Sequence, residues 1–129
     1  MDYPIIHSYS RAEAIRDGVL LDVTEIAKQF RFRYPVAVTS NLYHTYIVPN
    51  EDLGKSGETI ENRLGLVFAE LFYAIKGISN NNPQSRIQFS VEFLMDAIND
   101  EFEEIDLIAD CGPGDDLSPV ITIMLPEDD

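Results

Sequence analysis

The chain has 129 residues, of which 45% are hydrophobic, and its 9 basic and 23 acidic side chains give a formal net charge of −14. Its length and apolar content predict one domain with its own core and exclude a disordered acidic tail. The pI near 4.3 argues against direct binding to nucleic acid or to anionic membrane surfaces, because both require a basic surface.

The sequence carries no targeting signal. No apolar run reaches the roughly 18 residues of a membrane-spanning helix, and the first residues, MDYPIIHSYSR, lack the basic and apolar regions of a signal peptide. Cys111 is the only cysteine, which excludes an internal disulfide and is typical of a reducing compartment. We therefore expect a cytoplasmic protein.

The N-terminal part of the chain predicts short elements. Ser10 and Glu13 have the spacing of a capping box, so a helix is expected from residue 10 until Gly18 ends it. The apolar run 19–23 is a strand or a buried turn. Thr24 is a candidate N-cap for a second short helix over residues 25–30.

The segment 39–48 permits either a helix or a strand. Its aromatic and β-branched residues suit a strand, whereas Leu42, Tyr43, Tyr46 and Ile47 recur at helical spacing. We favour a helix with Ser40 as its N-cap. Residues 49–59, rich in Pro, Gly and polar side chains, are expected to form a loop.

A long helix is predicted over residues 58–77. Its apolar stripe has a period of 3.6 and consists of Ile60, Leu64, Val67, Phe68, Leu71, Phe72 and Ile75. Arg63 is assigned to the polar side of this helix. Leu66, Ala69 and Tyr73 widen the apolar arc, which favours packing on a second side or a homodimer through helix 58–77.

The last third of the chain predicts a sheet. After a turn-rich loop at 79–85, apolar and polar residues alternate over 86–94 and again over 103–111, and a third strand follows over 119–126. The simplest arrangement is an α+β fold with an antiparallel sheet of three or more strands. One long helix and two or three short N-terminal helices would cover its apolar face.

Four stretches of the chain, SRAEAIRDGVLLDVTEIAKQF, RYPVAV, CGPGDD and PVITIMLPEDD, resemble a family of small single-domain proteins of uncharacterised function from plasmids, phages and other mobile elements. The resemblance covers both ends of the chain and is weak between residues 39 and 104. It implies no catalytic residue. It does imply a mobile-element context, in which proteins that disarm host defences or regulate transfer are common.

Candidate catalytic and metal-binding side chains are sparse. His7 and His44 have no second ligand at metal-binding spacing. Cys111 is assigned to the buried face of its strand, because acidic neighbours would disfavour a reactive thiolate. A loose cation site at Asp110, Asp115 and Asp116 is the weaker alternative to ordinary turn residues. We predict no cofactor and no metal.

Acidic charge is the strongest functional signal. Between residues 86 and 129 the chain has 13 acidic side chains and one base, Arg86, and so carries −12 of the net −14. Alternate side chains of a strand lie about 6.6–6.8 Å apart, and each DNA strand carries one phosphate per roughly 3.4 Å. A row of carboxylates on a strand therefore approximates a row of phosphates at coarse spacing.

The leading hypothesis is a non-enzymatic, DNA-mimic-like interaction protein that binds the basic surface of a nucleic-acid-handling protein, as anti-restriction and anti-CRISPR proteins do. The residues predicted to bind this partner are Asp96, Asp100, Glu101, Glu103, Glu104, Asp106, Asp110, Asp115 and Asp116.

Two alternatives from other functional classes stay open. The first is a small enzyme with a polar site between SRAEAIRDG and CGPGDD, whose candidates are Arg11, Arg16, Asp22, Asp115 and Asp116. The second is a homo-oligomeric structural protein that uses the surplus apolar arc of helix 58–77.

Overall fold

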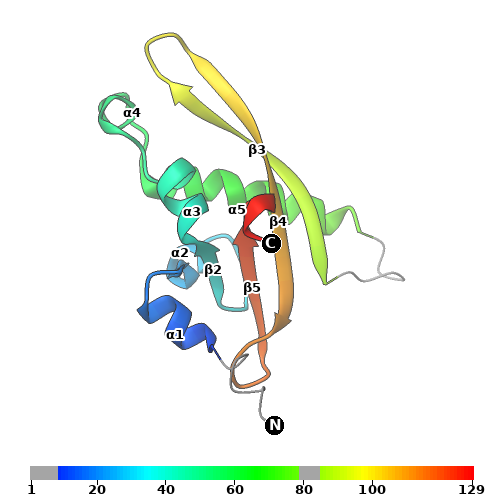
Figure 1. The fold of residues 1–129 in the computed structure, drawn as a ribbon. Helices are drawn as coiled ribbons and strands as arrows, with labels where there is room; N and C mark the ends of the chain where they lie inside the picture. The colour runs from blue at the N-terminus through cyan, green and yellow to red at the C-terminus, as the bar shows by residue number, and fades with distance from the viewer. Residues whose placement is uncertain (1–8, 79–84) are drawn as a thin grey trace.

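The computed structural model describes residues 9–78 and 85–129. They form an α+β fold in which a five-stranded mixed sheet, in the order β1-β2-β5-β4-β3, packs against one long helix, α5 (Figure 1). The elements are α1 (Arg11–Arg16), β1 (Leu20–Asp22), α2 (Thr24–Lys28), β2 (Val36–Thr39), α3 (Ser40–Leu42), the π-helix η2 (Tyr43–Ile47), α4 (Glu51–Lys55), α5 (Ile60–Lys76), β3 (Arg86–Asp96), β4 (Glu101–Pro113), β5 (Pro119–Met124) and the 3₁₀-helix η3 (Pro126–Asp128).

The predicted antiparallel meander is confirmed, and it forms part of a larger sheet. Strand β4 pairs antiparallel with both β3 and β5. Strand β2 then adds to β5 in parallel, and β1 adds antiparallel to β2. β2 was not predicted as a strand. Its first three residues, Val36, Ala37 and Val38, are all buried, so it lacks the alternation that marks a half-buried strand.

The core lies between α5 and one face of the sheet. Leu64, Val67, Phe68 and Leu71 of α5 pack in one cluster with buried residues of four strands, including Val38, Ile123, Leu107 and Phe93. The predicted alternation in β4 holds around Glu104 to Leu107, because Ile105 and Leu107 are buried while Glu104 and Asp106 are exposed, but Ile108 on the other face is buried too. Burial of this apolar face is the main force that holds the two layers together.

Several predicted helix boundaries hold and others shift. Ser10 and Glu13 form the capping box of α1, and Gly18 follows the helix with φ of +78°. Thr24 does not cap α2. Instead, its hydroxyl accepts a hydrogen bond from the backbone N–H of Val36 at 3.1 Å and so ties α2 to β2. The expected helix after residue 39 is confirmed, but Thr39 rather than Ser40 caps it.

One other prediction was wrong, and one confirmed helix is slightly shorter than predicted. The expected loop 49–59 contains helix α4, which begins after Asn50, whose side chain accepts from the N–H of Leu53. Helix α5 begins at Ile60, with Thr59 as its N-cap, so Glu58 stands outside it. His7 and most of the predicted loop 79–85 lie outside the described residues.

Arg63 is buried, although the sequence pattern placed it on the polar side of α5. Its side chain is 1% exposed, and among the described residues it is the only buried charged side chain. The guanidinium donates from Nε to the carbonyl of Tyr46 at 2.7 Å, and from Nη1 to Glu58 at 2.8 Å and to the carbonyl of Leu94 at 2.9 Å. Its carbon Cζ also lies 5.0 Å from the ring centre of Phe93. Arg63 therefore joins α5 to η2 and to β3.

The hairpin of β3 and β4 extends beyond the rest of the sheet. β5 pairs with β4 only from Ile108 onward, whereas β3 stays paired with β4 as far as Glu101. The end of the hairpin therefore projects past the other strands (Figure 1). Arg63 holds β3 close to this end of the hairpin through Leu94 and Phe93, and α4 also contacts β3.

We predict that Arg63→Met lowers the free energy of unfolding by about 3 kcal/mol, because two carbonyls and the Glu58 carboxylate lose their buried partner. Chemical denaturation followed by circular dichroism measures this change. Arg16→Met is the matched control, because the Arg16 side chain forms ion pairs but is 69% exposed. This control should lower the free energy of unfolding by less than about 0.5 kcal/mol. Equal stability of the two variants would contradict the role assigned to Arg63.

Candidate functional site: the acidic arm

The projecting end of the β3–β4 hairpin, residues 92–106, is called here the acidic arm. It carries seven carboxylates and no basic side chain, which is half of the chain's net charge of −14. Six of the seven acidic residues are exposed, and Asp96 is half-buried. The exposed carboxylates of a strand pair that extends past the rest of the sheet can reach a partner without rearrangement of the core.

The arm's outer face, turned away from α5, gathers carboxylates from both strands. Glu92 lies directly opposite Glu104 in the strand register, and Ser90 lies opposite Asp106. The hydroxyl of Ser90 donates to Asp106 at 2.9 Å. Like charges directly opposite each other destabilise a strand pair. Glu92 was not among the predicted site residues, because its place beside Glu104 depends on a register that the turn fixes.

The turn at the tip of the arm is organised by Asp96. Its carboxylate accepts from the N–H groups of Ile98 and Asn99 and from the side chain of Asn99. The Asn99 side chain, followed by these backbone donors, holds the pKa of Asp96 below its ordinary value. Asp100 adopts a φ of +56°, a conformation that Asp tolerates better than most residues. The tip is therefore a defined turn.

Two apolar side chains stand exposed among these carboxylates. Ile98 is 81% exposed at the tip and Phe102 is 54% exposed on β4. Neither was a predicted site residue. Aromatic side chains surrounded by polar groups are typical of the residues that dominate protein–protein contacts, so the arm offers both charge and apolar contact area.

Glu103 belongs to the opposite face of the arm, near Tyr46 of η2. The ring of Tyr46 stacks on that of Phe93 with 5.8 Å between their centres. Burial and then the nearby Glu103 carboxylate raise the pKa of the Tyr46 phenol. The inner face of the arm is therefore supported by packing on η2 as well as by Arg63.

The remaining predicted partner-binding residues lie at the far end of β4. Glu101 and Pro113 bound a strand of 13 residues, so roughly 40 Å separates the arm's tip from the β4–β5 connection. Asp110 lies 3.9 Å from Arg86. Asp116 accepts from the N–H of Ser118 at 3.0 Å. The structure thus divides the nine predicted residues into an arm group and a distant group.

Asp115 holds the beginning of α1 against the sheet. Its two carboxylate oxygens accept from the backbone N–H groups of Arg11 at 2.8 Å and of Ala12 at 3.0 Å. These bonds, more than the charge of Arg11, lower the pKa of Asp115. Asp115 thus joins two segments that are about a hundred residues apart in the chain.

The candidates of the enzyme alternative come together only in part. Arg11 and Asp115 line one polar cavity of about 350 Å³ together with Asp110. The guanidinium of Arg11, however, is bound to the hydroxyl of Thr122 at 2.7 Å and to the carbonyl of Ile121 at 2.8 Å. Arg16, Asp22 and Asp116 do not line this cavity. Arg16 pairs with Glu13 and Asp17, and Asp22 accepts from Thr24.

Metal-ligating side chains do not cluster in residues 9–78 and 85–129, where no group of three His, Cys, Asp or Glu side chains could hold an ion. His44 is exposed, and its ring packs edge-on against Tyr43. Among the described helices, none is both long and apolar enough to cross a membrane.

The surplus apolar arc of α5 is partly exposed. Leu66 is 43% exposed and Tyr73 is 69% exposed, and the two lie on one side of the helix because they are seven residues apart. Dimerisation through this face stays a prediction. Phe72 and Ile75, which were assigned to the core, are each 40% exposed and line an apolar cavity that also contains the half-buried Cys111.

Comparison with known proteins gives one match. The profile of a family of unknown function, DUF6573, matches residues 2–129. No curated protein and no solved structure matches the chain. The match confirms the resemblance to an uncharacterised family that the sequence motifs indicated, and it does not bear on mobile-element origin.

We predict a pH-dependent penalty for Asp115→Ala. Because the folded state lowers the pKa of Asp115, its contribution to stability is fully present above the unfolded pKa near 3.9. That contribution is lost as pH falls through the folded value. The variant should therefore have a lower melting temperature than wild type at pH 7, and this difference in melting temperature should narrow below about pH 4. Thermal melts from pH 7 to 3 test this. A gap that is constant or widens on acidification would contradict it.

Proposed function

We propose that this chain, which belongs to the DUF6573 family of unknown function, is an acidic interaction protein whose arm binds the basic surface of a nucleic-acid-handling protein. The observation that carries the proposal is the placement of seven carboxylates, without one base, on a projecting hairpin. Binding would occlude the site that otherwise holds a phosphate backbone.

The arm's charge is not explained by folding. Glu92 and Glu104 face each other across the strand pair, and no basic residue lies in the arm to offset them. This repulsion costs stability, yet a Lys at either position would form a favourable pair. A surface that retains such a cost is favoured as a functional surface, because charge complementarity to a partner would offset the repulsion on binding.

The arm is also preorganised for binding. Asp96 fixes the turn through three hydrogen bonds, and Arg63 fixes the adjoining part of β3 through the carbonyl of Leu94. A rigid surface loses little conformational entropy when it binds. The exposed Phe102 and Ile98 would supply apolar contacts between the charged ones.

The chemistry of the partner follows from the arm. Side chains that alternate on one strand face stand about 6.6–6.8 Å apart, which is close to twice the phosphate spacing along one DNA strand. Arginine and lysine side chains arranged for phosphates would therefore meet carboxylates. In the mobile-element context that the sequence motifs imply, such a partner would be a host restriction or CRISPR-type protein, and the chain would be its inhibitor.

The test compares two triple variants with the same change in net charge. Glu103→Gln, Glu104→Gln and Asp106→Asn remove three of the arm's seven carboxylates. Glu25→Gln, Glu51→Gln and Glu61→Gln neutralise three exposed carboxylates outside it. Each immobilised protein is challenged with DNA-binding proteins from a nuclease-treated extract and then with duplex DNA. We expect wild type and the control variant to retain partners that duplex DNA and salt release, and the arm variant to bind them roughly tenfold more weakly.

Stability measurements separate lost binding from lost folding. Removal of the Glu92–Glu104 repulsion should leave the arm variant at least as stable as wild type at low salt. If the arm variant folds and retains the same partners as wild type, or if duplex DNA does not compete, the proposed function is wrong.

A further inference from the structure

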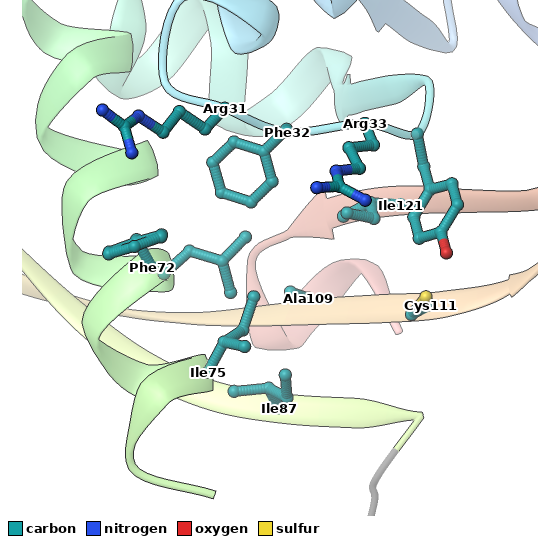
Figure 2. Close-up of a pocket in the computed structure, with 11 residues that line it drawn as sticks. Arg31, Phe32, Arg33, Phe72, Ile75, Ile87, Ala109, Cys111 and Ile121 are labelled. Atoms are coloured by element: carbon teal, nitrogen blue, oxygen red, sulfur yellow. The ribbon is translucent and has the colours of Figure 1, made fainter.

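A second surface, which is apolar and basic where the arm is acidic, lies between the C-terminal half of α5 and the loop after α2. It is an apolar cavity of about 350 Å³. Its walls come from Leu71, Phe72 and Ile75 of α5 and from Ile87, Ala109 and Ile121 of three neighbouring strands (Figure 2). This volume lies at the lower end of the range for small-molecule sites, and most such sites are also lined mainly by apolar side chains.

The mouth of the cavity is basic. Arg31 and Arg33 both line it, and Figure 2 shows their guanidinium groups on either side of the Phe32 ring. Within the described part of the chain, neither arginine forms an ion pair, whereas Arg16, Lys28, Lys55, Arg63 and Arg86 all do. Two guanidinium groups that lack an ion pair to any described residue are unexpected beside an apolar cavity in a protein with 9 bases and 23 acids.

The backbone at Arg31 adds an independent observation. Arg31 follows α2 with a φ of +70°, in the left-handed region where glycine is the preferred residue after a helix. An arginine there is strained, and strain of this kind gathers at functional sites. Because glycine would serve the helix end better, the arginine side chain itself is the feature that needs an explanation.

We propose that this cavity binds a small amphiphile that has a carboxylate head and an apolar body, such as a medium-chain fatty acid. The apolar body would lie against Phe72, Ile75 and Ile87, and the carboxylate would accept hydrogen bonds from Arg31 and Arg33. Guanidinium groups match the planar geometry of a carboxylate. The site is independent of the acidic arm, so either proposal can fail without the other.

The size and charge of the cavity favour a small molecule over a protein segment. A space of about 350 Å³ suits a ligand of a dozen or so heavy atoms better than a folded surface, which needs roughly 800 Å² of contact on each partner. A second copy of this chain would bring a net charge of −14 toward this one and be repelled.

The test titrates the protein with straight-chain alkanoates of six to twelve carbons, below their micelle concentrations, by calorimetry. Cys111 supplies a second readout, because it lines the cavity and is the chain's only cysteine. We expect the affinity to rise about fourfold for each added methylene until the cavity is full. Bound alkanoate should slow the reaction of Cys111 with a thiol reagent.

Variants identify the head-group contacts. Arg31→Gly should keep its melting temperature, because glycine suits the backbone, yet bind decanoate about tenfold more weakly. Arg33→Gln should show a similar loss of affinity, and decanol should bind more weakly than decanoate. Arg16→Gln, with the same charge change at an exposed site on α1, should bind as wild type does.

Any of three results would overturn the proposal. They are an affinity that does not depend on chain length, no protection of Cys111 at millimolar alkanoate, and unchanged binding by Arg31→Gly and Arg33→Gln. Protection of Cys111 by an acidic peptide but by no alkanoate would assign the cavity to a protein partner instead.

Discussion

The burial of one charged side chain, Arg63, governs how this small domain is assembled. A buried guanidinium is tolerated only when its hydrogen bonds are satisfied, and Arg63 finds its partners on Glu58 and on the carbonyls of Tyr46 and Leu94. These three residues belong to separate segments of the chain. If any one of them moved away, the buried charge would lose a hydrogen-bond partner and the fold would lose stability. Helix α5, the π-helix η2 and strand β3 are therefore coupled to one another.

The two surfaces with proposed functions lie near opposite ends of α5. Arg63, near the start of the helix, supports the acidic arm through Leu94 of β3. Phe72 and Ile75, toward its end, line the apolar cavity with Arg31 and Arg33 at the mouth. The fold therefore separates a strongly acidic surface from a small basic one, although the chain as a whole is acidic. Each surface also contains a feature that lowers the stability of the fold. In the arm it is the like-charge repulsion between Glu92 and Glu104, and at the cavity it is the positive φ of Arg31.

The sequence predicted those helices and strands that have a clear capping motif or a regular spacing of apolar residues. The capping box of Ser10 and Glu13, the alternation along β4 and the long helix were all visible in the sequence. Strand β2 was missed because a short buried run of apolar residues has no period. Arg63 was wrongly assigned to the polar side of α5 because its charge was given more weight than its position in the helical repeat. It stands four residues before Val67 and eight before Leu71, on the stripe that both occupy.

The candidate sites depended on contacts that are distant in sequence, so the sequence resolved them only partly. The acidity of the arm was evident, but the pairing of Glu92 with Glu104 follows from the turn that Asp96 organises. Asp115 looked like a free carboxylate and instead holds the start of α1. The cavity at Arg31 could not be predicted, because its walls come from one helix, one loop and three strands.

Native-state hydrogen exchange in wild type and in Arg63→Met tests most directly whether Arg63 holds the arm in place. The amide of Val48, bonded to Tyr43 in η2, should lose protection in the variant, and so should those amides among residues 92–94 and 102–104 that are hydrogen-bonded across the strand pair. The amide of Ile121, which is bonded to Pro35 in the centre of the sheet, should retain more of its protection. Equal acceleration at all these amides, or unchanged protection in the arm, would contradict the account.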